Sequence, residues 1–219
     1  MPTGTEEYYA QRAAEYDQVY AKPERQDDID VLTRLVAHEL AGRAVIDIAA
    51  GTGFWTERYA GTARSTTVCD VNEETLLVAR SRRAWTDDVT FACCDAFALG
   101  EVPGVFDAAF IGFFWSHLDL EELDRFLDGV IRRLEPGAAV VIIDNDYVDG
   151  SNHPISRIDE TGNTYQQRRL ADGREWEVRK NFPTGEEVVA RLARHGVDAT
   201  VTSTTYFWVA TFRTPLALS

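Results

Sequence analysis

Two glycines two residues apart, Gly51 and Gly53, follow a short run of β-favouring residues around Asp47. Glycine has no Cβ, so a turn built from it can bend sharply and let a ligand approach the backbone closely. A helix that begins after such a turn presents its partly positive N-terminus to the same ligand. The stretch therefore predicts a strand, a glycine loop and a helix that together bind a nucleotide-like molecule.

The glycine spacing distinguishes between two kinds of nucleotide. A dinucleotide fingerprint has a third glycine three residues after the second, and that position holds Thr56. Asp70 ends the next β-rich run, where an acid can accept hydrogen bonds from two ribose hydroxyls. A helix-capping or loop carboxylate is the alternative for Asp70. The pattern argues against NAD, and an NAD-linked oxidoreductase is kept only as an alternative from another class.

The string VIDIAAGTG, residues 45–53, resembles the first motif of class I methyltransferases that depend on S-adenosyl-L-methionine (SAM), with Ala49 at the usual first glycine. This resemblance implies SAM as cofactor and S-adenosyl-L-homocysteine as product. In the family an acid followed by a small or apolar pair binds adenine, and Asp95, Ala96 and Phe97 match that pattern. Phe97 as a plain core residue is equally open. The cofactor-binding residues that the resemblance implies are Tyr9, Arg12, Tyr16, Asp47, Ala49, Gly51, Trp55, Asp70, Val71, Asp95, Ala96, Phe97 and Gly112.

Near the N-terminus, a predicted helix over residues 5–20 places tyrosines on one face, with Arg12 one turn before Tyr16. The helix either simply packs on the body or resembles the lid of small-molecule methyltransferases, here residues 1–41. In such lids tyrosine and arginine side chains meet the methionine carboxylate, which a guanidinium can pair bidentately. Tyr20, at the end of this face, is expected on the substrate side.

The elements that position these residues alternate along the chain. Helical periodicity covers residues 26–40, 73–83, 120–134 and 184–195. Strands are expected at 45–48, 65–71, 89–93, 105–114 and 138–143, followed by a strand pair at 197–203 and 206–213. This order predicts one α/β domain over residues 1–219, with a doubly wound, seven-stranded, mostly parallel sheet of the class I methyltransferase, Rossmann-like type. Its last strand is reversed, and a β-hairpin insert lies within residues 145–183.

The insert is too long for a simple connection. Ala171-Asp172-Gly173 predicts a three-residue hairpin loop, which sets Arg168 opposite Trp176 and puts both on one face with Gln166, Val178 and Lys180. A two-residue turn would put Arg169 there instead. Residues 163–181 hold five basic and three acidic side chains, which suggests capture of a small anion. The alternative is a solvated hairpin whose arginines pair with Glu175 and Glu177.

The apolar run at 105–114 leads into His117, at the sheet edge where open α/β sheets place ligands. His117 is predicted to be a substrate contact or a base, with a structural histidine as the alternative. The predicted catalytic residues are thus His117, Arg168 and Lys180. The predicted substrate-binding residues are His117, Tyr20, Arg168, Trp176 and Lys180.

The lid, the segment before His117 and the basic hairpin together resemble small methyltransferases of bacterial natural-product and antibiotic biosynthesis, in particular phosphonate O-methyltransferases of the dehydrophos type. The resemblance implies O-methylation of an anionic acceptor, whose oxygen needs orientation and no general base. One alternative is an O- or N-methyltransferase that acts on a neutral phenol or amine with His117 as base. Another is a SAM-binding module without chemistry.

Composition limits the partners. A formal net charge of −14 over 219 residues argues against nucleic-acid binding. The sequence has three cysteines and no long apolar run, so we expect a cytoplasmic protein without a membrane segment. We also expect a monomer or homodimer that acts on a small anionic substrate. Asp144-Asn145-Asp146 resembles the magnesium ligands of catechol-type methyltransferases, but the preceding strand lacks the acid that such a site also needs, so no metal is expected.

Overall fold

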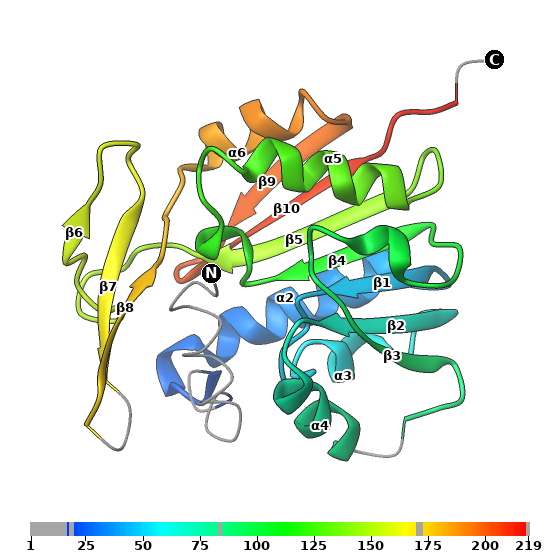
Figure 1. Cartoon of the computed structure of the whole chain (residues 1–219), viewed down its shortest axis with the longest axis horizontal. Coiled ribbons are helices and arrows are strands. Elements are labelled where there is room, and N and C mark those ends of the chain that lie inside the picture. Colours follow the sequence, from blue (N-terminus) through cyan, green and yellow to red (C-terminus); the bar gives the residue numbers. More distant parts are fainter. Residues whose placement is uncertain (1–16, 18–19, 83–84, 170–172, 218–219) are drawn as a thin grey trace.

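The structure is a computed structural model that describes residues 17, 20–82, 85–169 and 173–217. Seven strands form the main sheet, in the order β3-β2-β1-β4-β5-β10-β9 (Figure 1). They are β1 (Ala44–Ile48), β2 (Ser65–Asp70), β3 (Val89–Cys93), β4 (Ala108–Gly112), β5 (Ala139–Asn145), β9 (Val197–Ser203) and β10 (Phe207–Arg213). The first five pair in parallel, whereas β10 runs antiparallel to both of its neighbours. The predicted doubly wound sheet with a reversed last strand is confirmed.

The central strands are buried on both faces, as their continuous apolar sequences predict. Alternate residues enter two separate cores: Val45 packs with α2 (Gln26–Leu40) and α3 (Thr56–Tyr59), while Ile46 belongs to the core that includes α5 (Leu123–Arg133) and α6 (Gly185–Leu192). α4 (Glu73–Ser81) packs beside β2 and β3. Short 3-10 turns lie at η2 (Pro23–Arg25), η3 (Leu99–Glu101) and η4 (Trp115–His117). The helices therefore cover the two faces and leave the carboxyl ends of the parallel strands for a site.

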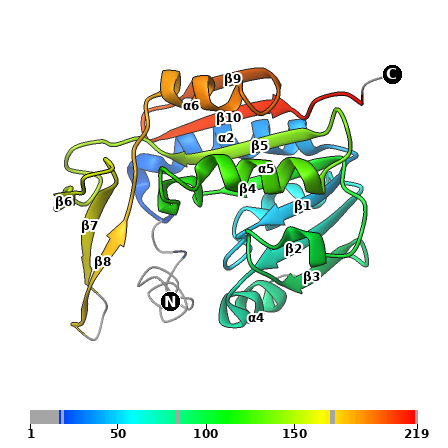
Figure 2. The ribbon, with the colours of Figure 1, turned by 45° about the horizontal axis from the view of Figure 1, so that its top comes forward.

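The insert forms a second, antiparallel sheet of β6 (Arg157–Ile158), β7 (Thr164–Arg169) and β8 (Glu175–Arg179), which stands beside the main sheet in both views (Figures 1 and 2). Arg168 lies opposite Trp176, and Gly173 has a φ of +89°. The predicted register is confirmed, whereas Ala171 and Asp172 of the predicted three-residue loop lie outside the described residues. Gln166 and Val178 on the face of Arg168 are fully buried, whereas Arg169 is exposed. Within the described ranges, no helix is both long and apolar enough to cross a membrane.

Candidate functional site

A pocket opens at the carboxyl ends of β1, β2 and β4. All ten of the predicted cofactor residues that the structure describes line it: Asp47, Ala49, Gly51, Trp55, Asp70, Val71, Asp95, Ala96, Phe97 and Gly112. Tyr20 and His117, predicted on the substrate side, line the same pocket. Tyr9, Arg12 and Tyr16 lie outside the described residues. Local motifs far apart in the sequence therefore meet at one place.

The loop after β1 has the backbone that a close ligand requires. Gly51 and Gly53 have φ angles of +57° and +73°, and a Cβ added to Gly51 would stand in open space, with no atom within 4 Å. Ala49 also has a positive φ, +55°, which is strained for an alanine. This explains structurally why glycine is favoured at that position. The helix that follows, α3, has only four residues, so the loop itself contributes more of the cradle than the helix does.

Asp70 binds this loop to the tip of β2. Its Oδ2 accepts a hydrogen bond from Gly51 N at 2.8 Å, and its Oδ1 accepts one from Asn72 N at 2.9 Å. Burial raises the pKa of this carboxyl, and the two backbone donors oppose that shift. A carboxylate has about four acceptor positions, so each oxygen retains capacity for a ribose hydroxyl. Its loop-capping role and a role in binding ribose are compatible.

Asp47 occupies the buried floor of the pocket. Its Oδ2 accepts hydrogen bonds from Thr56 Oγ1 at 2.5 Å and from Tyr59 Oη at 2.7 Å. Burial raises the pKa of Asp47 to about 7, although both hydrogen bonds lower it. The charge of this acid therefore changes near neutral pH, next to the space that a cationic ligand would fill.

At the other end, Asp95 Oδ1 accepts a hydrogen bond from Phe97 N at 2.8 Å. The Phe97 ring lines the pocket and also packs edge-on against Phe126, with 5.8 Å between centroids. The two alternatives for Phe97, pocket wall and core residue, are thus both true of its position. Asp95 and the Phe97 ring therefore lie together at one end of the pocket, where the family resemblance implies adenine binding.

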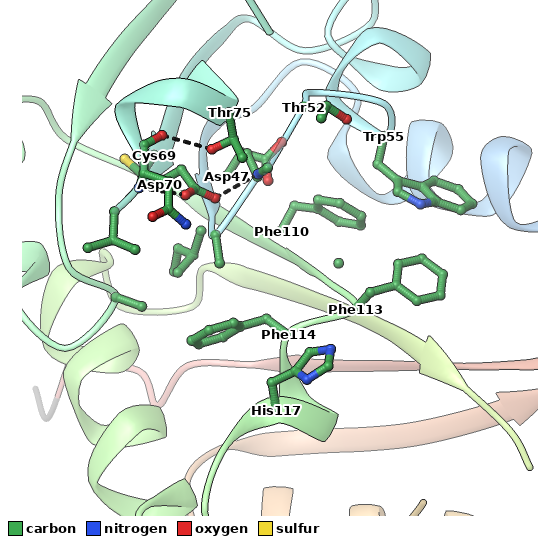
Figure 3. A pocket seen from close by; sticks show the side chains of 18 of the residues that line it. Asp47, Thr52, Trp55, Cys69, Asp70, Thr75, Phe110, Phe113, Phe114 and His117 are labelled. Atoms are coloured by element: carbon green, nitrogen blue, oxygen red, sulfur yellow. Dashed lines mark hydrogen bonds between the residues drawn. The ribbon is translucent and has the colours of Figure 1, made fainter. Parts of the chain in front are cut away.

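Aromatic rings form the opposite side of the pocket, as Figure 3 shows for Trp55, Phe110, Phe113 and Phe114, with His117 near them and Asp47 and Asp70 across from them. Tyr20 stacks on Phe54 at 4.0 Å, and Phe113 lies 5.7 Å from Trp55. Sequence reasoning did not single out the phenylalanines. Their position at the end of an apolar strand was the available signal.

His117 joins the pocket to the insert. Its Nδ1 lies 2.7 Å from the carbonyl oxygen of Arg179, and because a carbonyl only accepts, Nδ1 carries the proton. Asn181 N donates to Ser116 O at 2.8 Å in the same contact. Burial, together with the nearby charge of Lys180, lowers the pKa of His117 to about 3. His117 is therefore neutral and is a weak base.

Lys180 lies beneath this contact and is buried, with 5% of its surface exposed. Its Nζ donates to Ser116 Oγ at 2.5 Å and to Asp144 Oδ1 at 2.9 Å. Asp144, at the end of β5, is fully buried. The sequence predicted Lys180 on one face of the hairpin with Gln166 and Val178, and like them it is buried, but the sequence did not predict that a protein carboxylate partly neutralises it. Sequence reasoning considered Asp144 only as a magnesium ligand, and an ammonium group contacts it instead.

Arg168 and Trp176 face inward from β7 and β8 but do not line the pocket described above. Arg168 Nη2 donates to Gln166 Oε1 at 2.6 Å, whereas Arg168 Nε and Trp176 Nε1 are buried without an acceptor. Glu177 pairs with Arg157 at 2.6 Å. Among the described side chains, neither Glu175 nor Glu177 forms an ion pair with Arg168.

No group of three or more His, Cys, Asp or Glu side chains in the described part of the chain is arranged to hold a metal ion. The absence of a metal remains a prediction.

Comparison with known proteins identifies the part of the chain that forms the pocket. Residues 45–137 match the model of the methyltransferase domain family. This stretch resembles a methyltransferase domain. It extends from β1 through α5 and contains every described pocket residue except Tyr20. The insert that carries Arg168 and Lys180 lies outside the methyltransferase domain match.

Curated relatives include demethylmenaquinone methyltransferases. The one from Clavibacter sepedonicus is 36% identical over 110 residues, which are 50% of this chain and 44% of that protein. The one from Paenarthrobacter aurescens (strain TC1) is 33% identical over 52% of this chain and 41% of that protein. The match spans less than half the length of these relatives.

Solved structures match over nearly the whole chain. The DhpI–SAH complex superposes with a TM-score of 0.78 at 27% identity, covering 97% of this chain and 96% of that one. The DhpI–SAM–HEP complex gives a TM-score of 0.76 at 27% identity over 94% of both chains. The N-methyltransferase NodS from Bradyrhizobium japonicum WM9, bound to S-adenosyl-L-homocysteine, gives 0.66 at 20% identity over 97% of this chain and 100% of that one. The methyltransferase domain and the insert thus both lie within the class I SAM-dependent methyltransferase fold.

Proposed function

We propose that the chain is a SAM-dependent methyltransferase of small-molecule metabolism that methylates an oxygen of an anionic acceptor, and that the acceptor is a phosphonate. The cofactor part rests on the fit of the pocket. The glycine loop leaves open space for a ligand, Asp70 retains acceptor capacity for ribose, and Asp95 and Phe97 line the pocket where adenine would bind. Solved relatives with this fold hold SAM or its demethylated product.

One observation carries the acceptor part: two buried N–H groups on the inner face of the hairpin lack acceptors. They belong to Arg168 and Trp176, which are directly opposed across β7 and β8. A buried donor without an acceptor costs about 1–3 kcal/mol, and oxygen atoms of a ligand would remove that cost. Because Arg168 is also cationic and its hydrogen-bond partner among the described residues is the neutral Gln166, an anionic oxygen group is the favoured ligand.

The chain's residues then have separate tasks in the reaction. When bound, SAM supplies the methyl group from its sulfonium, and as the acceptor oxygen forms the new O–C bond the C–S bond breaks and its electron pair returns to sulfur. Arg168 and Trp176 orient the acceptor, and the aromatic wall around Trp55 and Phe113 excludes water. Lys180 adds positive charge near Arg168, and the neutral His117 closes the contact between pocket and hairpin.

The neutral-acceptor alternative would use His117 as its base. Its low pKa argues against this, because a group that titrates near pH 3 accepts a proton from a phenol or an amine poorly at neutral pH. A phosphonate dianion is already nucleophilic and does not need that step.

The test measures formation of S-adenosyl-L-homocysteine with methylphosphonate and ethylphosphonate, and with a panel of phenols and amines. We expect turnover on the phosphonates. Arg168→Ala should raise KM for the phosphonate about 10- to 100-fold, the value of a lost charged hydrogen bond, with little change in KM for SAM. Trp176→Phe, which removes only the N–H, should raise it about 3- to 10-fold.

Arg169→Ala is the matched control, because Arg169 is the next residue and points to solvent from the same strand. It should leave both KM values near those of the wild type. Turnover on neutral acceptors alone would overturn the phosphonate proposal. Cofactor binding with no turnover on any acceptor would favour a non-catalytic SAM-binding module, and binding of NADH without SAM would remove the methyltransferase proposal.

A further inference from the structure

A second pair of cations, Lys22 and Arg25, lies on the segment that leads into α2. Lys22 Nζ donates to the carbonyl oxygen of Ser151 at 2.6 Å, and Arg25 Nη2 donates to the same oxygen at 3.3 Å. Arg25 also donates to Ser151 Oγ and to Asn145 Oδ1. In Figures 1 and 2 this segment lies between the insert and the main sheet. Two positive charges are thus fixed at one carbonyl group, beside the insert.

These two cations lack close counter-charges among the described residues. All of their hydrogen-bond acceptors belong to Ser151 and Asn145, which are uncharged, and neither cation has a carboxylate within ion-pair distance in the described ranges. Glu24 acts on both cations, and Asp28 on Arg25, only at longer range. Arg25 is 6% exposed and lies over the rings of Tyr206 and Phe207. A largely buried guanidinium without a carboxylate is costly unless something else supplies the negative charge.

Arg168 connects this pair to the site proposed for the acceptor. Burial is the main cause of the lowered pKa of Lys22, Arg25 and Lys180, and the charge of Arg168 lowers all three further, so the four cations act on one region. Asp144 is the carboxylate in contact with Lys180 there. Like charges gathered in this way repel one another. With the carboxylate of Asp144, the four cations carry a net charge of +3, so one phosphonate dianion would leave one positive charge in this region without a negative partner.

We propose that the acceptor carries a second anionic oxygen group, remote from the oxygen that is methylated, and that Lys22 binds it. This inference rests on the proposed function. Lys22 Nζ uses one of its three N–H groups on Ser151, so two remain for a ligand. Arg25 uses four of its five N–H groups on Ser151 and Asn145; it positions the loop that holds Lys22 and adds positive charge. The substrate class is therefore a phosphonate with a second acidic group, such as a phosphonocarboxylate.

The test compares acceptors that differ only in that second charge. 3-Phosphonopropionate and its amide, 3-phosphonopropionamide, have nearly the same shape, and phosphonoacetate and 4-phosphonobutyrate vary the distance between the two groups. In the wild type, kcat/KM should be about tenfold higher for the best diacid than for its amide, as expected for one charge-assisted hydrogen bond. Lys22→Gln should bring the ratio of kcat/KM for diacid and amide to about one. It should do so by lowering kcat/KM for the diacid, while kcat/KM for the amide stays unchanged. Lys22→Arg should retain most of the wild-type ratio.

Arg157→Gln is the matched control, because Arg157 is an exposed cation of the insert that already pairs with Glu177; the diacid-to-amide ratio should not change. Equal kcat/KM for diacid and amide at every length, or a ratio that survives Lys22→Gln, would overturn this inference and leave the proposed function intact. Failure of all phosphonates as acceptors, diacid and amide alike, would instead overturn the proposed function together with this inference.

Discussion

The ammonium of Lys180 lies 2.9 Å from Oδ1 of Asp144, and the pair is almost completely withdrawn from solvent. Burial alone would raise the pKa of Asp144, but the charge of Lys180 outweighs it and holds that pKa below its usual range. Ser116 N and Oγ also donate to this carboxylate, each at 2.9 Å. The pair therefore joins three parts of the chain: the end of β5, the η4 turn and the end of the insert.

Replacing one member of this ion pair should lower the free energy of unfolding much more than replacing both members. Asp144→Asn leaves a buried ammonium without its counter-charge and should lower the free energy of unfolding by about 3 kcal/mol. The double variant Asp144→Asn, Lys180→Met should recover most of that loss, because a buried ion pair replaced by uncharged groups is often close to neutral for stability. Urea unfolding of the wild type, both single variants and the double variant measures the coupling. Strictly additive losses would contradict the description of the two groups as a pair.

Asp47 should make the stability of the ligand-free protein depend on pH. Its pKa is about 7 in the folded protein, against a usual value of 3.8. The folded state therefore holds a proton that the unfolded state has released, and this contribution to stability is complete below about pH 4 and is lost as pH rises to 7. The loss amounts to about 4 kcal/mol at most, by the conversion of pKa shifts into free energy.

Asp47→Asn removes this titration and keeps an oxygen that can accept from Thr56 and Tyr59. The variant should be more stable than the wild type at pH 8, with a flatter dependence of unfolding free energy on pH between 4 and 7. Denaturant unfolding across that range measures both effects. A variant that is less stable at pH 8, with the slope of the wild type, would show that the Asp47 carboxyl does not titrate in this range.

Because SAM carries positive charge, SAM should also bind more weakly to the wild type as pH falls below 7.

The pH dependence of catalysis should report the acceptor rather than His117. His117 has its Nδ1 proton held by the carbonyl of Arg179 and a pKa of about 3, so it does not change charge in the neutral range. The acidic limb of kcat/KM should instead follow the second ionisation of the phosphonate, which for phosphate-like groups lies at about 6. Electron-withdrawing substituents on the acceptor should move that limb to lower pH. A limb that keeps its midpoint for every acceptor would assign it to a group of the enzyme.

Replacing Ala49 by glycine should remove the steric strain of its positive φ angle. With a φ of +55°, alanine there pays about 1–2 kcal/mol of steric strain, part of which the greater flexibility of unfolded glycine would offset. Ala49→Gly should therefore raise the free energy of unfolding by about 0.5–1 kcal/mol. Ala50→Gly, at the neighbouring position, whose φ is not positive, is the control and should lower stability slightly. Thermal unfolding of both variants tests this; a lower melting temperature for Ala49→Gly than for Ala50→Gly would contradict the assignment of strain.

Features that repeat within one segment could be predicted from the sequence. Apolar runs of strand length alternating with helical periodicity specify a doubly wound sheet because short, right-handed connections leave few other arrangements. The glycine spacing after β1 also predicts where the pocket lies, because it specifies a tight turn within one short segment. Period-two alternation in the insert put Arg168 and Arg169 on opposite faces, since side chains on a strand alternate between its faces, but the choice between them depended on the turn length and only the structure set Arg168 opposite Trp176.

The sequence by itself thus determined the fold, the pocket and the alternation of side chains along the hairpin. Only the tertiary structure decided which charges meet, because ion pairing and burial depend on segments that are far apart along the chain. Lys180 and Asp144 are separated by 36 positions, and Lys22 and Ser151 by 129. No pattern within one segment encodes these distances, so the partial neutralisation of Lys180 and the gathering of Lys22, Arg25 and Arg168 became visible only once the insert and the N-terminal segment were placed against the sheet.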